Sequence, residues 1–309
     1  MIADQIVAGI DVSKQRLDVH VVPSGRALST ANSGPGLARL IGQLRALGVQ
    51  RIGLEASGGY ERHAAGELSR AGFAVHVVPP ARVRALARAL GRPAKTDPID
   101  AAMIARYLLL TPGQHIHQAD AARERLDELA RLRRQLVAER NKLVSRLDIA
   151  SDPLVRRMLG RMHTTIAANI ARLDAEIASH IRASPLKARH DILIAVPGVG
   201  PVLAATLLCD LPELGQASPK QLASLVGVAP HARQSGKTTR PGRCSGGRAS
   251  VRNVLYMATL SALKARAPAL RPFYDRLRAN GKPFKLAINA AMRKFITILN
   301  AIVKQSTVA

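Results

Sequence analysis

Four carboxylates stand at positions from which three separate segments could bring them together. Asp11 and Glu55 each follow a short apolar run of strand character, and Asp97 and Asp100 open a helix-like segment. A carboxylate at the end of an apolar strand is costly to bury unless it is paired or bound to a metal. The four side chains are therefore candidate ligands of one metal site.

Carboxylate oxygens are hard ligands that suit Mg²⁺, with Mn²⁺ as the alternative ion. Two such ions about 4 Å apart could activate the attacking oxygen and stabilise the leaving oxygen in phosphoryl transfer. We therefore predict that Asp11, Glu55, Asp97 and Asp100 are both catalytic residues and metal ligands.

The Asp pair also has a structural explanation. Asp97 precedes Pro98, as an N-cap residue would, and acids in a first helical turn satisfy free amides and complement the helix dipole. Taken alone, Asp97 and Asp100 would more often be structural, and their combination with Asp11 and Glu55 favours metal binding.

Two further acids lie near these positions in the sequence. Asp18 alternates with apolar residues and is expected on the exposed face of its strand, while Glu61 is expected to begin a helix. We assign both Asp18 and Glu61 to structure, because neither ends a buried strand.

The segment HARQSGKTTRPGRCSGGRAS, residues 231–250, contains no acid and is typical of a loop over phosphates. Basic side chains neutralise phosphate oxygens, and glycines allow a close approach of the backbone. The predicted nucleic-acid contacts are Arg233, Lys237, Arg240, Arg243 and Arg248. A serine here could be a nucleophile, but no base stands beside one, so the residues leave Ser235, Ser245 and Ser250 equivalent.

The order of elements over residues 5–110 would position the acids. The patterns predict a hairpin from residue 6 to 23, a strand over 27–31, a helix over 37–47 and a strand over 51–57. A helix over 60–71, a strand over 73–79 and helices over 83–90 and 99–110 follow. This order suits an α/β, ribonuclease-H-like layout, and we expect such a catalytic domain over residues 1–112.

Residues 113–188 change to a helical composition. One helix is expected from Ala119 to Leu147 and a second from Leu154 to Ile181, together an antiparallel hairpin. Apolar residues recur three, four or seven positions apart at Leu126, Leu129, Leu132, Leu136, Leu143 and Leu147. Such a seam is typical of a coiled coil or a helical subunit contact, and a helical pair packed on its own domain fits equally well.

A mainly helical domain is expected over residues 189–309. It begins with ILIAVPGVGPVLAATLLCDL, which resembles a helix-hairpin-helix. At such a turn Gly198 and Gly200 would let backbone amides bind a phosphate without reading bases. The alternative is a tight turn between two core helices, because Gly and Pro are ordinary turn residues.

The charge of the chain indicates a polyanionic partner. Lys and Arg number 46 against 21 Asp and Glu, a formal charge of +25, of which residues 191–309 hold +13. Such an excess favours nucleic acid through counterion release. The last third of the chain is therefore the better candidate for a nucleic-acid clamp.

Cysteine usage and the apolar runs indicate the compartment. Cys209 and Cys244 have no metal-binding spacing, which suits a reducing cytoplasm. We see no signal peptide and no apolar run long enough to cross a bilayer. We therefore expect a soluble cytoplasmic protein with no membrane partner.

The segments GIDVSK, LEASGGYE, KTDPIDA, PGVGPVLAATLL and QSGKTTRPG resemble the insertion-sequence DEDD transposases, also called bridge-RNA-guided recombinases, over nearly the whole chain. The resemblance implies an N-terminal domain like the RuvC Holliday-junction resolvase, a coiled-coil linker, and a C-terminal transposase domain. The Asp, Glu, Asp, Asp order of that family is matched by Asp11, Glu55, Asp97 and Asp100.

The resemblance also implies a mechanism and partners. A serine of the C-terminal domain attacks a DNA phosphate to give a transient phosphoserine link, and Mg²⁺ at the acidic site acts on the same phosphate. Ser235 matches that serine best, although Ser245 lies in a second small-residue loop close by. The implied partners are donor and target DNA, a structured bridge RNA, and further copies of the chain in a tetramer assembled from dimers.

We therefore expect a site-specific DNA recombinase of an insertion sequence. A RuvC-like, metal-dependent nuclease that resolves junctions without a covalent intermediate is the alternative. A third possibility, of another class, is a metal-free nucleic-acid-binding scaffold whose acids only cap and pair.

Overall fold

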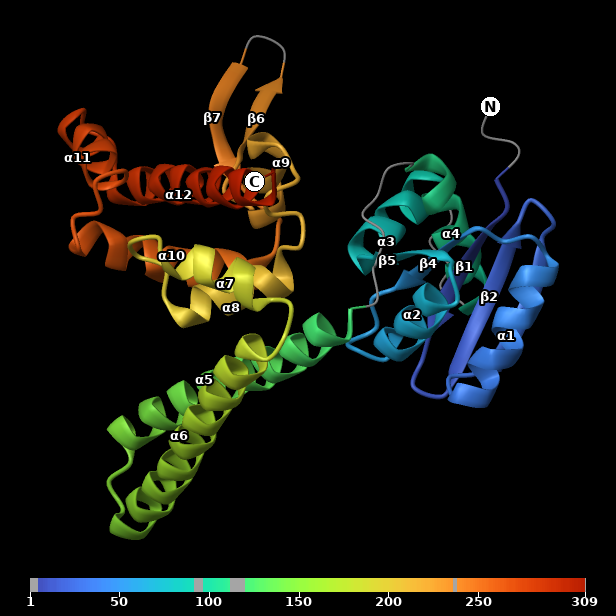
Figure 1. The fold of residues 1–309 in the computed structure, drawn as a ribbon, viewed down its shortest axis with the longest axis horizontal. Coiled ribbons are helices and arrows are strands. Elements are labelled where there is room, and N and C mark those ends of the chain that lie inside the picture. Colours follow the sequence, from blue (N-terminus) through green and yellow to red (C-terminus); the bar gives the residue numbers. More distant parts are fainter. Residues whose placement is uncertain (1–4, 92–96, 112–119, 236–237, 309) are drawn as a thin grey trace. The chain divides into compact units, whose positions relative to one another are not determined.

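The computed structural model describes residues 5–91, 97–111, 120–235 and 238–308, with backbone alone for 97–99, 231–235, 238–241 and 307–308. The chain divides into two compact units, residues 1–120 and 121–309 (Figure 1). The helical pair expected over 113–188 lies within the second unit. Its separation as a region of its own, distinct from residues 189–309, stays a prediction.

The first unit is built on a five-stranded sheet of order β3-β2-β1-β4-β5. The first three strands, β1 (Val7–Val12), β2 (Arg16–Val22) and β3 (Arg26–Ala31), form an antiparallel meander. Strands β4 (Arg51–Glu55) and β5 (Ala74–Val78) run parallel to β1.

Four helices accompany this sheet: α1 (Gly34–Ala46), α2 (Glu61–Arg70), α3 (Pro80–Ala89) and α4 (Asp97–Leu110). Helix α1 lies in the connection from β1 to β4 and α2 in the connection from β4 to β5, as parallel pairing requires. The order of strands and helices confirms the α/β layout expected from the sequence, and its ribonuclease-H-like character stays a prediction.

The helices cover both faces of the sheet. On one face, Ile10 and Leu54 pack with Leu40 of α1 and Leu68 of α2 in a single apolar cluster. On the other face, Val7 of β1 packs with residues of α3 and α4, among them Val83, Ile104 and Leu108. Both faces being covered explains the nearly unbroken apolar character of β1 and β4.

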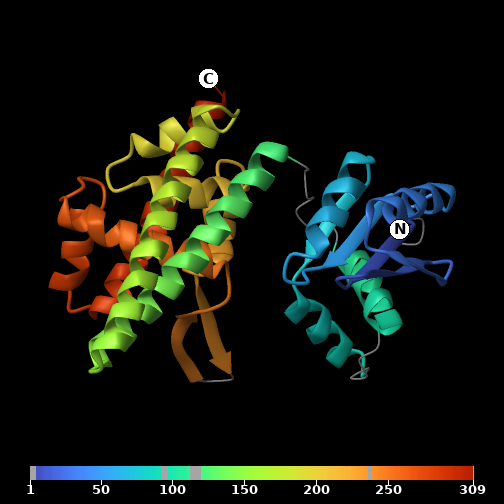
Figure 2. The ribbon, with the colours of Figure 1, turned by 90° about the horizontal axis from the view of Figure 1, so that it is seen from below.

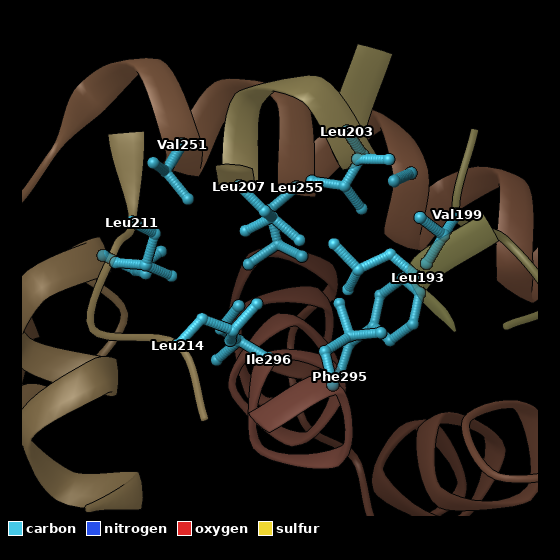
Figure 3. Close-up of a cluster of buried hydrophobic side chains, with 14 of the residues drawn as sticks. Leu193, Val199, Leu203, Leu207, Leu211, Leu214, Val251, Leu255, Phe295 and Ile296 are labelled. Atoms are coloured by element: carbon cyan, nitrogen blue, oxygen red, sulfur yellow. The ribbon is translucent and has the colours of Figure 1, made fainter. Parts of the chain in front are cut away.

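The second unit is helical apart from one β-hairpin. Its elements are α5 (Ala121–Ile149), α6 (Pro153–Arg182), α7 (Lys187–Ile194), α8 (Pro201–Asp210), α9 (Pro219–Val226), β6 (Pro230–Ser235), β7 (Thr238–Cys244), α10 (Ala249–Lys264), α11 (Arg271–Ala279) and α12 (Phe284–Val308). Figure 3 shows its core, where Leu203 and Leu207 of α8 meet Leu255 of α10 and Phe295 of α12.

Helices α5 and α6 form the expected antiparallel hairpin, side by side in Figures 1 and 2. Two ion pairs of 2.5 Å join them, Arg125 with Glu176 and Arg133 with Asp174. At the base, Leu126 of α5 and Ile181 of α6 belong to the core of the second unit. That base is thus a helical pair packed on its own unit.

Farther along the hairpin the predicted seam is less buried. Leu143 is buried, whereas Leu132 is 46% exposed, and Leu154 and Met158 near the connection are each 58% exposed. A contact with another subunit through this part of the hairpin stays a prediction.

Helix α12 corrects one expectation from the sequence. Over Phe284–Ser306 its length and hydropathy would suffice to cross a membrane, although no such run was expected. Half of that span is buried inside the second unit, where Ile288, Phe295 and Val303 join the core. Burial against other helices accounts for its apolar composition.

Candidate acidic site and nucleic-acid interface

Asp11 and Glu55 lie on neighbouring parallel strands at the same edge of the sheet. The register pairs Ile10 of β1 with Leu54 of β4, and the next residue of each strand is an acid. Because side chains alternate between faces at the same rate on both strands, Asp11 and Glu55 point to the same face. Both are partly buried.

Helix α4 lies on that face because two glycines leave room for it. A Cβ on Gly9 would stand 2.1 Å from the carbonyl oxygen of Ala101, and one on Gly53 would stand 2.8 Å from Ile104 Cγ2. Each glycine precedes an acid by two residues in its strand, so the acids share the face on which α4 packs.

The direction of α4 brings Asp100 toward the acidic edge of the sheet. Arg51 Nη2 donates to the carbonyl oxygen of Leu108 at 3.3 Å, so the last turns of α4 lie at the start of β4. Four strand residues from Arg51 to Glu55 rise about 13 Å. Eight helical residues from Leu108 back to Asp100 rise about 12 Å. Asp100 therefore lies near the level of Glu55.

Asp97 is the first residue of α4, and Pro98 stands in its first turn. Its side chain lies outside the described residues, so both the metal-ligand prediction and the capping alternative for Asp97 stay as predictions.

The donor chemistry of this edge fits a hard divalent cation, because three carboxylates approach it from β1, β4 and α4. Among the side chains that the structure describes, no three His, Cys, Asp or Glu groups are gathered closely enough to hold an ion. The fourth predicted ligand, Asp97, is not among those side chains.

Asp18 corrects the expectation of an exposed acid. It pairs directly with Asp11 across β1 and β2, so it points to the face covered by α4, and its side chain is only 15% exposed. Arg16 Nε donates to its Oδ2 at 2.8 Å. The sequence pattern could not reveal this burial, because the covering helix lies about 80 residues away. The ion pair supports a structural role for Asp18.

Glu61 begins α2, as expected. It also binds the backbone of the preceding turn, which the sequence did not reveal. Its side chain is buried, and Oε2 accepts hydrogen bonds from the amides of Ser57 at 2.9 Å and Gly59 at 2.8 Å. Glu61 thereby holds the turn that directly follows Glu55.

His20 of β2 is opposite Gly9 in the β1–β2 register. Burial, and then the positive charge of Arg106, lower the pKa of His20. The imidazole is therefore kept neutral beneath α4, and we assign it to packing.

The predicted phosphate-binding loop proves to be a β-hairpin of β6 and β7. Ser235 pairs with Thr238 and Arg233 pairs with Arg240, and Ser235 is the last residue of β6. Residues 236–237, including Lys237, and the side chains of Ser235, Arg233 and Arg240 lie outside the described residues. The sequence concealed these two strands because its Ser, Gly and Pro content favours loops.

The base of this hairpin holds the remaining members of the basic segment. Arg243 and Ser245 are exposed at the end of β7, and Ser250 lies in the first turn of α10. Arg248 donates to both carboxylate oxygens of Glu213 at 2.6 Å and to the carbonyl oxygen of Asp210 at 3.0 Å. These bonds favour a structural role for Arg248, which leaves it the weakest of the predicted phosphate contacts.

The Gly198–Gly200 turn lies between α7 and α8, as expected. Gly198 has φ +94°, and a Cβ there would stand 2.4 Å from the Cβ of Ala262, so close packing requires this glycine. Gly200 precedes the first turn of α8, and a Cβ there would meet nothing within 4 Å. The packing of Gly198 favours a turn between core helices, and phosphate binding by the amides stays a prediction.

Neither cysteine belongs to a described metal site. Burial raises the pKa of the Cys209 thiol far above its usual range, which keeps it protonated and unreactive. Cys244 is exposed at the end of β7.

Two family models match the chain. One, for transposases of the IS110 DEDD type, matches residues 8–150, and another, described as the transposase IS116/IS110/IS902 family, matches residues 190–275. Together they cover most of both compact units.

Similar proteins include two named pilin gene-inverting protein, from Moraxella lacunata and Moraxella bovis. Each is 28% identical over 316 residues, which is 96% of this chain and 95% of the relative. An uncharacterized 43.6 kDa protein of insertion element IS110 from Streptomyces coelicolor is 28% identical over 65% of this chain and 52% of its own length.

One solved structure is that of RuvC from T. thermophilus in complex with a Holliday junction substrate. It is 19% identical, covers 33% of this chain and 90% of the RuvC chain, and has a TM-score of 0.26. A score this low does not support an argument about fold or function.

Proposed function

The chain belongs to the IS116/IS110/IS902 transposase family and is a DNA transposase, and from this premise we propose that it cleaves and rejoins DNA at specific sites as the recombinase of an insertion sequence. The observation that supports the proposal most directly is the meeting of Asp11 and Glu55 at one edge of the sheet, on the face where α4 brings Asp100. Acids that only capped helices would not need these three elements to converge.

Asp11, Glu55, Asp97 and Asp100 would hold Mg²⁺ or Mn²⁺ in this function. The ion would supply charge stabilisation for the scissile phosphate in phosphoryl transfer. The glycines under α4 keep the helix, and with it Asp97 and Asp100, at a fixed distance from β1 and β4.

Ser235 is the proposed nucleophile. Its Oγ would form a bond to phosphorus while the bond to the DNA 3′ oxygen breaks; the serine proton passes to solvent, and the leaving oxygen takes up a proton to become a 3′ hydroxyl. The 3′ hydroxyl of another strand can then attack the phosphoserine and release Ser235, so rejoining needs no outside energy source. The position of Ser235 at the end of β6 supports access to a large substrate. Ser245 is the other candidate.

A structured bridge RNA and a tetramer belong to the proposal because the chain resembles recombinases that use them. The acids and Ser235 lie on two separate compact units, so the serine of one copy could complete the acidic site of another. The basic excess of +13 in residues 191–309 supports binding of RNA as well as DNA.

The second candidate function is a RuvC-like nuclease that resolves junctions by metal-assisted hydrolysis. The acidic edge of the sheet supports either reaction. The Moraxella relatives are named for inverting a gene, and inversion requires rejoining as well as cutting, which favours the recombinase.

The acidic site can be tested with the full chain, DNA containing the element ends, and the flanking element RNA. Cleavage should require Mg²⁺ or Mn²⁺, stop on addition of a chelator, and be lost in Asp11→Asn and Glu55→Gln, which should also bind Mn²⁺ more weakly by calorimetry. Cleavage that survives both the chelator and these substitutions would exclude the site.

A further inference from the structure

A strongly basic segment lies outside every role described above. Residues 264–294, a tenth of the chain, contain nine Lys or Arg and one acid, so they hold +8 of the total +25. They span the end of α10, all of α11 and the first half of α12, and the family match ends at residue 275.

The single acid in this segment, Asp275, is already paired with an arginine of the same segment. Asp275 accepts two hydrogen bonds from Arg271 Nε, at 2.9 Å and 2.7 Å. Within the described part of the chain, no ion pair joins an acid to Arg276, Arg278, Lys282 or Lys285. All four of these side chains are exposed, and Arg278 Nη1 donates to the carbonyl oxygen of Lys282 at 2.6 Å.

One aromatic ring draws two cations from different helices together. The ring centroid of Phe273 in α11 lies 5.6 Å from Arg276 Cζ and 4.7 Å from Lys294 Nζ of α12. The contact fixes α11 and α12 as parts of a single basic surface. It also places two cations against one ring, and a bound polyanion would reduce the repulsion between them.

The N-terminus of α12 carries positive side chains, which oppose the helix dipole. Lys285 is its second residue, Lys282 lies just before it, and no acid stands in the first turn. Cations at this end oppose the helix dipole, whereas an anion bound there would interact favourably with the dipole and with both lysines. Beside them, Phe284 is 44% exposed.

We propose that this α11–α12 basic surface, made of Arg276, Arg278, Lys282, Lys285 and Phe284, binds the phosphodiester backbone of a nucleic acid. Lys294 lies nine residues beyond Lys285, about two and a half helical turns, so it is on the opposite side of α12, where it contacts Phe273 of α11. Phe284 would stack on a base of an unpaired strand.

The inference extends the proposed function, which requires a bound nucleic acid, to a surface that the cleavage site does not include. An anionic membrane is the rival partner for a basic helix. Insertion would need a free apolar face on α12, but Ala287, Ile288 and Ala291 are buried in the core. The burial of these residues favours a nucleic acid.

The test measures binding of the full chain to labelled 25-residue single-stranded RNA, single-stranded DNA and duplex DNA of one sequence, in EDTA, over a range of salt. The variant Arg278→Gln/Lys282→Gln/Lys285→Gln should reduce the slope of log K against log salt by about two to three and weaken binding at least about tenfold near 0.1 M salt. The matched control, Arg70→Gln/Arg125→Gln/Lys187→Gln, removes the same charge from side chains that are paired with acids. It should change the slope by less than about one.

Equal slopes and affinities for the variant and the wild type would overturn the inference, as would an equal loss in the control. The charge-conserving variant Arg278→Lys/Lys282→Arg/Lys285→Arg should bind like the wild type, and the Gln variant should keep the wild-type circular dichroism, which separates lost charge from lost folding. Vesicles containing phosphatidylserine test the rival, and a loss of vesicle binding alone would overturn the nucleic-acid assignment.

Phe284→Ala distinguishes the sources of phosphodiester. It should weaken binding of single-stranded RNA and DNA by roughly fivefold to a hundredfold and leave duplex binding unchanged. Unchanged single-strand binding would overturn the stacking role. The assay measures binding and not strand cleavage, so a failure here is distinguishable from a failure of the proposed recombinase activity.

Discussion

Gly9 of β1 and Ala101 of α4 are so close that a Cβ on the glycine would lie 2.1 Å from the carbonyl oxygen of Ala101. This contact sets α4 directly on the sheet. It also sets Asp100, the residue before Ala101, toward the end of β1 at which Asp11 stands.

Gly9→Ala should therefore displace α4 from the sheet. Overpacking typically costs about 1–3 kcal/mol, and a clash with backbone at this distance should reach at least the upper end. Urea unfolding measures the loss. The control is Gly42→Ala in α1, where a Cβ meets nothing within 4 Å and should be neutral or stabilising. An equal free energy of unfolding for the two variants would contradict the close contact between Gly9 and Ala101.

Asp11→Asn should abolish cleavage and Asp18→Asn should not, although the two residues are paired across β1 and β2. Asp11 lies near the end of β1 on the same face as Glu55, whereas Asp18 is bound by Arg16. The first substitution should abolish Mg²⁺-dependent strand cleavage, and the second should retain most of it. Loss of cleavage in Asp18→Asn, with the fold intact by circular dichroism, would show that Asp18 belongs to the site.

Glu61→Gln should loosen the turn after Glu55. Its carboxylate accepts two backbone amides, and charge-assisted bonds of this kind are worth about 1.5–3 kcal/mol. We expect a loss of stability near that range and weaker Mn²⁺ binding by calorimetry. Glu67→Gln serves as the control, because its exposed pair with Arg70 should contribute little.

His20 should make stability fall in mild acid. Its pKa is lowered in the folded chain, so below the ordinary value of 6.5 the unfolded chain takes up a proton that the folded chain does not. The contribution is therefore fully present above pH 6.5 and is lost as the pH falls toward the lowered pKa. The urea midpoint should drop between pH 7.5 and 5.5, and less so in His20→Gln. An identical drop in both proteins would contradict this role.

Much of the first unit could be predicted because its signals are local. The apolar runs before Asp11 and Glu55, and the helical spacing between them, follow from burial on a sheet covered on both sides. Strands β1 and β4 form as expected and run parallel, so their carboxyl ends, with Asp11 and Glu55, lie at one edge of the sheet.

The features that could not be predicted depend on contacts with residues far away in the sequence. The burial of Asp18 requires α4, the bonds of Arg248 require Glu213, and the packing of Gly198 requires Ala262. The β6–β7 hairpin was mistaken for a loop because its residues favour turns locally. The α11–α12 basic surface was visible only as excess charge until Phe273 was found to join two helices.

The most direct test of the proposed recombinase is the search for a protein–DNA link. The full chain, the flanking element RNA and end-labelled donor DNA are incubated with Mg²⁺ and run on a denaturing gel before and after protease treatment. We predict a protease-sensitive adduct that is absent in Ser235→Ala and Asp11→Ala and present in Ser245→Ala. Free cut ends without an adduct, persisting in Ser235→Ala, would contradict the serine nucleophile and identify a metal-dependent nuclease.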